Sequence, residues 1–214
     1  MKIGIIGAGD VGATLGKSWA RKGHQIMFGV RNTQSPKASN LLKSSNANLK
    51  VGSVSEAASF SDVIILAIPW SAVNQIIGMA GDLAGKLLVD TTNPFTSDLK
   101  GMVIEPSTSA AEEIAKLAPK SKVVKAFNTI GIKVLDNMIF GTNKADVFIC
   151  GSDFKSRTTV KKLATDLGFE VVDVGPLSNA RLLEQLSLLW IELAFRQEMG
   201  PNIAFKLLTR EDEM

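Results

Sequence analysis

Residues 2–12 read Lys2-Ile3-Gly4-Ile5-Ile6-Gly7-Ala8-Gly9-Asp10-Val11-Gly12, and this stretch decides the fold. Its first half, residues 2–6, is short and apolar and ends at a glycine cluster, which predicts a buried β-strand. Residues 13–22 are good helix formers that end at Gly23, and residues 25–29 predict a second strand. The order of strand, glycine turn, helix and strand predicts a βαβ unit.

The rest of the chain repeats this alternation. Strands are expected at residues 49–51, 63–68, 87–90, 122–127, 146–150 and 169–174. Helices are expected at residues 37–43, 55–59, 71–79, 110–117, 155–167 and 179–199, with a shorter tail helix after Pro201. Strands that alternate with helices predict a mainly parallel sheet covered on both faces. The predicted fold class is therefore α/β, a doubly wound sheet of the Rossmann type. We expect a nucleotide-binding domain over residues 1–120 and a smaller α/β and helical part over residues 121–214.

The three glycines fit a dinucleotide site because they follow a strand and open a helix. Gly7 permits a tight turn, Gly9 leaves room for a pyrophosphate near the backbone, and Gly12 lets the helix pack on the strand. The helix N-terminus, at Asp10 and Val11, directs free N–H groups and the positive end of its dipole at the phosphates. A glycine-rich turn without a ligand is the alternative.

The residues after the second predicted strand indicate which dinucleotide would bind. A site specific for NAD normally places a carboxylate there, on the ribose hydroxyls, but this chain has Arg31, Asn32 and Thr33. Arg31 can bind a 2′-phosphate with two hydrogen bonds and lie over the adenine, while Asn32 and Thr33 offer further donors. The predicted cofactor is NADP(H), and the alternative is that Arg31 is only a solvated loop residue.

Two further strands are followed by turns that contain proline. The sequence Ile68-Pro69-Trp70 follows the fourth strand, and Asn93 precedes a proline after the fifth. The carboxyl ends of an open parallel sheet face the ligand crevice, so a nicotinamide ring would rest against Ile68, Pro69 and Trp70, with Asn93 near the inner ribose or the carboxamide. Alternatively, the prolines only end the strands, and Trp70 belongs to the core or to an interface.

The composition excludes several kinds of catalysis. The chain has one histidine, one cysteine and no tyrosine. His24 follows Gly23 in a turn, so we expect a surface residue there, and Cys150 ends an apolar strand, which favours a buried small hydrophobe. No side chain is therefore assigned as a catalytic acid or base, and no metal site is expected. With a single cysteine an intrachain disulfide is impossible, which favours a reducing, cytoplasmic compartment.

The charge distribution argues against two classes of partner. The chain has 24 basic and 21 acidic residues, for a net charge of +3, but the basic residues are scattered and form no stripe with aromatics. Binding to nucleic acid is therefore not expected. Residues 63–81 carry no charge, yet they contain Pro69 and polar side chains, so a buried strand and an amphipathic helix are expected there rather than a membrane span.

Three segments outside the glycine turn show a resemblance to a known family. They are Val123-Val-Lys-Ala-Phe127-Asn128-Thr129-Ile130, Cys150-Gly-Ser-Asp153 and Val174-Gly-Pro-Leu-Ser178-Asn-Ala-Arg181-Leu-Leu-Glu184. With the Ile68-Pro69-Trp70 turn and Met199-Gly200, they resemble the NADP-dependent oxidoreductases of coenzyme F420 over residues 2–208. The resemblance implies a homodimer and direct hydride exchange between NADP(H) and a 5-deazaflavin stacked on the nicotinamide.

The same resemblance implies where the acceptor would bind. Its ring would lie near Phe127, Asn128, Thr129 and Ile130, with residues 176–178 as a further wall, so the part from residue 121 onward would form the acceptor site and contribute to dimer contacts. Archaeal members carry His-Thr-Ile where this chain has Asn128-Thr129-Ile130. The version with asparagine is similar to the cytosolic domain of the STEAP ferric reductases, which reduce an ordinary flavin. The expected co-substrate is thus F420 or a flavin. Because no membrane domain follows Met214, iron reduction across a membrane is not implied.

Two other functions remain open from the sequence. One is reduction of a small imine or carbonyl compound, which needs a proton donor such as Lys125 or Lys133. The other is an NADP(H)-binding or sensing protein without catalysis. The apolar residues of the final helical region fit either a dimer interface or ordinary core packing.

Overall fold

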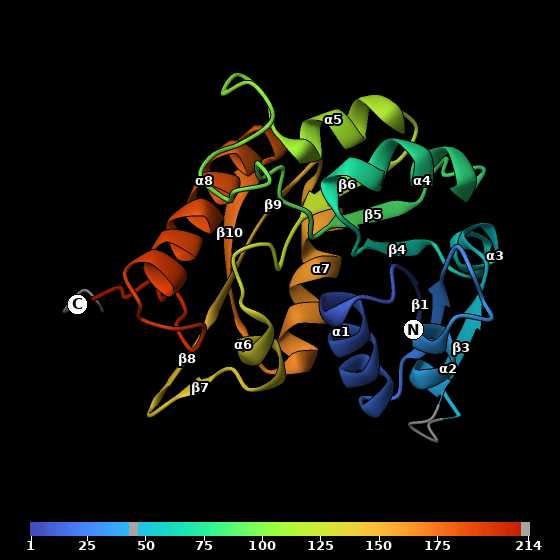
Figure 1. Ribbon diagram of the computed structural model, residues 1–214, viewed down its shortest axis with the longest axis horizontal. Coiled ribbons are helices and arrows are strands. Elements are labelled where there is room, and N and C mark those ends of the chain that lie inside the picture. Colours follow the sequence, from blue (N-terminus) through green and yellow to red (C-terminus); the bar gives the residue numbers. More distant parts are fainter. Residues whose placement is uncertain (43–46, 211–214) are drawn as a thin grey trace.

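The computed structural model describes residues 1–42 and 47–210, and a single large sheet organises them. Its eight strands lie in the order β10-β9-β6-β5-β4-β1-β2-β3. Figure 1 shows the helices on both sides of this sheet. The predicted fold class, a doubly wound and mainly parallel α/β sheet of the Rossmann type with an α/β and helical extension, is confirmed.

The elements follow the predicted alternation closely. The strands are β1 (Lys2–Ile6), β2 (Gln25–Gly29), β3 (Leu49–Gly52), β4 (Val63–Leu66), β5 (Leu87–Asp90), β6 (Lys122–Lys125), β7 (Ile139–Phe140), β8 (Asn143–Lys144), β9 (Asp146–Gly151) and β10 (Glu170–Pro176). The α-helices are α1 (Asp10–Arg21), α2 (Pro36–Leu42), α3 (Val54–Phe60), α4 (Val73–Ala80), α5 (Ala110–Leu117), α6 (Ile132–Asp136), α7 (Phe154–Leu167) and α8 (Ala180–Ile191). Short 3-10 turns, η1 (Trp70–Ala72) and η2 (Leu177–Asn179), precede α4 and α8, and a π-helical turn, η3 (Glu192–Arg196), follows α8. The last residue of the helix expected at 37–43 lies outside the described residues.

The six strands β1–β6 run parallel to one another, so their carboxyl ends meet at one edge of the sheet. β1 pairs in parallel with β2 on one side and β4 on the other, and β4, β5 and β6 continue in parallel. β9 runs antiparallel to β6, and β10 is parallel to β9. The sheet thus continues across residue 120, while the division into two domains there remains a prediction.

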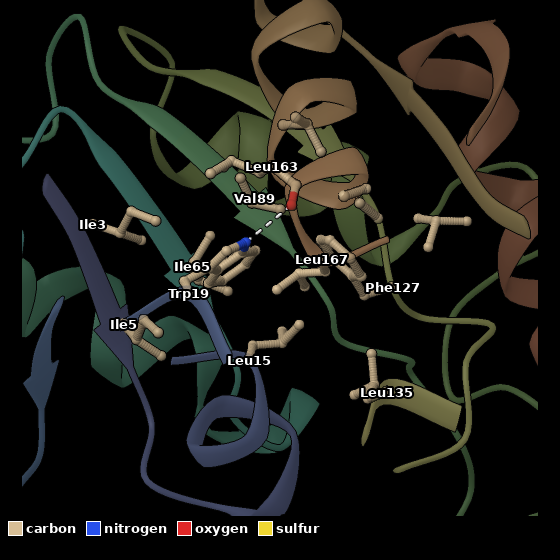
Figure 2. Close-up of a cluster of buried hydrophobic side chains, with 14 of the residues drawn as sticks. Ile3, Ile5, Leu15, Trp19, Ile65, Val89, Phe127, Leu135, Leu163 and Leu167 are labelled. Atoms are coloured by element: carbon tan, nitrogen blue, oxygen red, sulfur yellow. Dashed lines mark hydrogen bonds between the residues drawn. The ribbon is translucent and has the colours of Figure 1, made fainter. Parts of the chain in front are cut away.

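Alternating side chains of the strands build one core on each face of the sheet. Ile65 packs on the face covered by α1 and α7, whereas its neighbours Ile64 and Leu66 pack under α3, α4, α5 and α8. On the first face the Trp19 indole donates a hydrogen bond to the backbone oxygen of Leu163 at 2.9 Å. Figure 2 shows this bond among the labelled core side chains. It fixes α1 against α7, which joins the glycine-turn unit to the second half of the chain.

Two sequence-based expectations are wrong. His24 does lie in the turn after α1, but its side chain is only 8% exposed, because Met1 and Asp166 of α7 cover it. Residues 201–210 form no helix. They have no regular secondary structure, and the backbone oxygen of Phe205 accepts a hydrogen bond from the Asp146 N–H at the start of β9. Backbone groups that bond to distant residues are not available for a local helix.

The final helical region and one hairpin also differ in detail. The regular α-helix ends at Ile191, and the next turn is π-helical. The small antiparallel pair of β7 and β8 was not anticipated. In the described part of the chain, no helix is both long and apolar enough to cross a bilayer.

Candidate functional site

The glycine turn between β1 and α1 has the geometry that its sequence predicts. Gly7 has φ +118°, and a Cβ there would lie 2.1 Å from the backbone oxygen of Ala67. A Cβ at Gly12 would lie 2.4 Å from the Gly7 oxygen, so both positions require glycine. In contrast, a Cβ at Gly9 would meet nothing within 4 Å. The turn therefore brings backbone close to β4 and leaves open space in front of Gly9, where a ligand can approach.

The N-terminus of α1 faces this open space without a side-chain cap. Gly9 is the N-cap residue, and no side chain accepts a hydrogen bond from the first turn. The helix is twelve residues long, so its first N–H groups and its dipole present a positive end. Asp10 is exposed, Val11 is half-buried, and neither side chain lines the cavity described next. These two positions can contribute to a phosphate site through their backbone N–H groups.

A cavity of about 430 Å³ runs along the carboxyl ends of β1, β2 and β4. Its lining includes Gly7 and Gly9 at one side and Arg31 and Asn32 at the other. Asn32 accepts a hydrogen bond from the Gln34 N–H through Oδ1, which leaves its side-chain N–H groups free to donate to a ligand. Thr33 is exposed and does not line the cavity.

Lys37, which was not singled out from the sequence, is a second positively charged side chain at this end of the cavity. Lys37 lies in the first turn of α2 and lines the same cavity as Arg31. Ser35 lies before the helix, and its Oγ accepts a hydrogen bond from the Ala38 N–H at 3.3 Å, which fixes the first turn of α2. Two positive side chains that converge beside the adenosine end of such a site suit a phosphate dianion. The only sequence signal was a lysine six residues after Arg31.

The turn after β4 supplies the opposite wall. Ile68 and Pro69 line the cavity, and their contact with a nicotinamide ring stays a prediction. Trp70 does not line it, and its side chain packs half-buried against the core under α4. A flat ring in this cavity can therefore rest against Ile68 and Pro69. Trp70 instead belongs to the core, which was the alternative considered for it from the sequence.

Asn93 and Asn128 lie next to each other at the ends of β5 and β6, outside that cavity. Asn93 Nδ2 donates to the backbone oxygen of Asn128 at 2.9 Å, and Asn128 Nδ2 donates to Asn93 Oδ1 at 3.0 Å. Ser187 of α8 joins them, because its Oγ donates to the Asn128 oxygen and accepts from Asn93 Nδ2. Asn93 and Asn128 thus lie together, but the side-chain N–H groups of each donate to the other loop or to α8.

The rest of the segment predicted for the acceptor is buried. Phe127 is 2% exposed and packs edge-on against Trp19 with ring centroids 5.8 Å apart. Figure 2 labels both residues among the core side chains. Thr129 is 2% exposed and Ile130 is 8% exposed. Phe127 has φ +62°, an uncommon backbone conformation for a residue with a side chain. In this structure Phe127 can contribute only backbone to a bound ring, and the roles of Thr129 and Ile130 stay predictions.

Three charged side chains are buried just beneath these loops. Lys125 Nζ lies 2.7 Å from Asp90 Oδ2, 2.7 Å from Glu184 Oε1 and 2.7 Å from the backbone oxygen of Thr92. Burial lowers the pKa of the Lys125 ammonium, but Asp90 and Glu184 outweigh burial and hold that pKa above its usual value. Burial raises the pKa of the Glu184 carboxyl, and Lys125 opposes part of the rise.

This environment corrects the view of Lys125 as a proton donor to a substrate. Its side chain is fully buried, and three oxygens surround its ammonium group. Lys133, the other lysine considered, is exposed on α6. Cys150 is buried as predicted, and burial raises the pKa of its thiol to about 12, so the thiolate is not available at neutral pH.

Comparison with known proteins agrees with this geometry. Residues 2–94 match the family described as NADP oxidoreductase, coenzyme F420-dependent. Over these residues the chain therefore resembles a family of NADP-dependent oxidoreductases. The matched segment contains the glycine turn, both cations of the cavity and the wall at Ile68 and Pro69. The sequence-based recognition of this family is confirmed.

Individual relatives extend the match beyond residue 94. The F420-dependent NADP reductase of Methanocaldococcus jannaschii is 28% identical over 220 residues, covering 96% of this chain and 94% of that protein. A crystal structure of a protein assigned as an F420-dependent NADP reductase from Arthrobacter sp. FB24 superimposes with a TM-score of 0.88 at 27% identity, covering 98% of this chain and all of that one. The metalloreductase STEAP3 of Rattus norvegicus is 34% identical over 187 residues, 87% of this chain. This chain spans only 36% of that protein.

Proposed function

We propose that this protein transfers a hydride between NADP(H) and a deazaflavin or flavin-type acceptor. The observation that carries the proposal is the single cavity that joins the open glycine turn to Arg31 and Lys37. The glycine turn suits the pyrophosphate, and the two cations suit a 2′-phosphate, the group that distinguishes NADP(H) from NAD(H). Relatives named as F420-dependent NADP reductases and as metalloreductases support the redox assignment.

The protein's part in such a reaction is to bind, orient and exclude water. NADPH supplies the hydride chemistry itself. Arg31 and Lys37 would hold the phosphate end, and the N-terminus of α1 would hold the pyrophosphate. Ile68 and Pro69 would support one face of the nicotinamide, leaving the other face for the acceptor. Hydride transfer between two flat rings needs a close, fixed stacking, and this arrangement requires no side-chain acid or base.

The acceptor ring would lie beside the loops that follow β5 and β6. This placement rests on the resemblance and on the position of Asn93 and Asn128 after β5 and β6, of which β5 pairs with β4. The buried side chains of Thr92, Asn128 and Thr129 each have an oxygen without a hydrogen-bond partner within the described ranges. Such oxygens favour a polar ligand or water at these loops over an apolar contact.

The acceptor is tested by mixing the purified protein with NADPH and, in separate reactions, F420, FMN or FAD, and following nicotinamide absorbance. Oxidation of NADPH with at least one of the three is expected, and the preferred one names the acceptor class. Tight NADPH binding without oxidation by any acceptor would instead support a binding or sensing protein. A cytoplasmic location fits the single cysteine and remains part of the proposal.

We also propose that the protein is a homodimer whose contact includes α8 and the residues after it. Leu182, Leu189, Phe195 and Met199 are 66%, 47%, 57% and 59% exposed. Several large apolar side chains on one helix and its continuation are unusual for a surface that stays in water. Sedimentation at low concentration tests this, and Leu189→Lys should shift a dimer toward the monomer.

A further inference from the structure

The buried cluster of Asp90, Lys125 and Glu184, here called the lysine cluster, ties three elements together. Asp90 is the last residue of β5, Lys125 the last residue of β6, and Glu184 lies in α8. Their side chains are 0%, 0% and 3% exposed. Lys125 donates to Asp90 Oδ2 and to the backbone oxygen of Thr92, and its third 2.7 Å contact is Glu184 Oε1.

Stability alone is a weak reason to keep such a cluster. Removing three charged groups from water costs several kcal/mol for each ion, and well-packed apolar residues are often equally stable in such positions. Unlike apolar groups, charged groups form directional hydrogen bonds that fix the orientation of their partners. The Lys125 ammonium fixes the orientation of the Thr92 carbonyl, and therefore of the chain that enters Asn93.

The lysine cluster shares its helix with the asparagine pair. Leu183, next to Glu184, accepts a hydrogen bond from Asn128 Nδ2 through its backbone oxygen at 3.0 Å. Ser187, one turn further along α8, bonds both Asn93 and Asn128. The loops after β5 and β6 are therefore each fixed to α8 twice, once through the lysine cluster and once through the asparagine pair.

These loops lie beside the cavity on the side away from Arg31. Asp90 pairs in register with Leu66 of β4, and Thr91 Oγ1 donates to the Leu66 oxygen at 3.0 Å. Leu66 is two residues before Ile68, which lines the cavity. A dinucleotide with its adenosine half at Arg31 and its pyrophosphate at the glycine turn extends its other half toward β4 and β5.

We propose that Lys125, held by Asp90 and Glu184, is a positioning residue for the nicotinamide half of the cofactor. The inference rests on the proposed function, and it assigns a task to side chains that touch no ligand. Lys125 would act through Thr92, Asn93 and Asn128, which lie at the ends of β5 and β6, next to the strand that leads to Ile68. The adenosine half, which Arg31 and Lys37 hold, does not depend on the lysine cluster.

The test compares two ligands that differ only in the nicotinamide half. Dissociation constants are measured by titration calorimetry for NADPH and for 2′-phospho-ADP-ribose, which lacks the nicotinamide. The main variant is Asp90→Asn/Lys125→Met/Glu184→Gln, which removes all three charges together and leaves none of them unpaired. We expect it to weaken NADPH binding roughly tenfold and to leave 2′-phospho-ADP-ribose binding unchanged.

A control variant removes a partly buried ion pair elsewhere on the same sheet, in which the Lys206 side chain is 23% exposed. Lys206 Nζ lies 2.9 Å from Oδ1 of Asp146, whose side chain is 2% exposed, at the start of β9. Asp146→Asn/Lys206→Met should leave both dissociation constants as in the wild type. If the triple variant does not fold, Glu184→Gln, which keeps an acceptor oxygen for Lys125, is read in the same way with a smaller expected effect.

Each outcome decides the matter. Wild-type dissociation constants for both ligands in the triple variant would overturn the positioning role. An equal loss of affinity for both ligands would also overturn it, because that result indicates general damage to the cavity. Wild-type protein that binds neither ligand would refute the proposed function itself, and the inference would fall with it. Selective loss of NADPH binding in the triple variant and not in the control supports the inference.

Discussion

Asn93 and Asn128 hold each other across the ends of β5 and β6 through two hydrogen bonds of 2.9 and 3.0 Å. One bond uses a backbone oxygen and the other a side-chain oxygen, so the pair fixes both a loop and a rotamer. The pair connects two loops that are 35 residues apart in the chain. The two hydrogen bonds therefore hold the loops after β5 and β6 in a fixed position relative to each other.

Asn128→Ala removes both donors of this side chain. The oxygens of Asn93 and Leu183 then lose their partners in a buried environment, which costs about 1–3 kcal/mol of unfolding free energy. Urea unfolding followed by circular dichroism measures the change. Asn32→Ala, at an exposed position, is the control and should alter stability by less than about 0.5 kcal/mol. Equal effects of the two variants would show that the buried pair carries no special stability.

Arg31→Ala and Lys37→Ala test the predicted preference for NADP(H). Each removes one charged partner of the 2′-phosphate, so each should weaken NADPH binding by about 1.5–3 kcal/mol while NADH binding changes little. Fluorescence titration with the two cofactors measures both constants. A parallel loss of NADH affinity would contradict the phosphate role.

Gly7→Ala should reduce the stability of the fold, whereas Gly9→Ala should reduce only the affinity for NADPH. A Cβ at Gly7 would lie 2.1 Å from the Ala67 oxygen at φ +118°, so this variant should lose at least about 2 kcal/mol of stability. A Cβ at Gly9 meets no protein atom within 4 Å and its backbone φ of −75° suits alanine, so the fold should remain. Thermal melting should separate the two, and Gly9→Ala should melt as the wild type yet bind NADPH more weakly. Wild-type affinity in Gly9→Ala would contradict the pyrophosphate position.

Because His24 is buried, we expect the folded state to lose stability at mildly acidic pH. Burial and the nearby N-terminal ammonium lower the pKa of the His24 imidazole, although Asp166 opposes part of that shift. Because the folded-state pKa lies below the unfolded value of about 6.5, stability is present above pH 6.5 and declines as pH falls through the folded-state pKa. Unfolding free energies measured between pH 8 and pH 5 should show this decline. His24→Asn should flatten it, and an unchanged pH profile in that variant would exclude His24 as its source.

The strands, helices and glycine turn could be predicted because their signals are local. The run of apolar residues in β1, the glycine spacing and the helix formers of α1 all lie within about twenty residues. The exposure of His24 could not be predicted, because Asp166 covers it from 142 positions away. The irregular chain after Pro201 likewise depends on β9 and on Trp190, whose indole donates to the Ile203 oxygen at 2.9 Å.

The residues that follow β1, β2 and β4 could be grouped from the sequence, because each follows a predicted strand. Gly7 and Gly9, with the loop at Arg31 and the turn at Ile68, line one cavity. The polar interior was harder to foresee, since Lys125 sits in an apolar strand and its partners come from β5 and α8. Phe127 was expected near a bound ring, and the structure packs its side chain into the core. A sequence shows that a residue follows a strand, but only the fold shows which way its side chain turns.

The measurement that tests the central claim most directly is the single-turnover rate of NADPH oxidation at saturating acceptor, with deuterium on one face or the other of nicotinamide C4. If the cavity holds the ring in one orientation and passes the hydride directly to the acceptor, deuterium on one face should slow the reaction and deuterium on the other face should not. Equal rates for both labelled cofactors, or no oxidation with F420, FMN or FAD, would contradict the account.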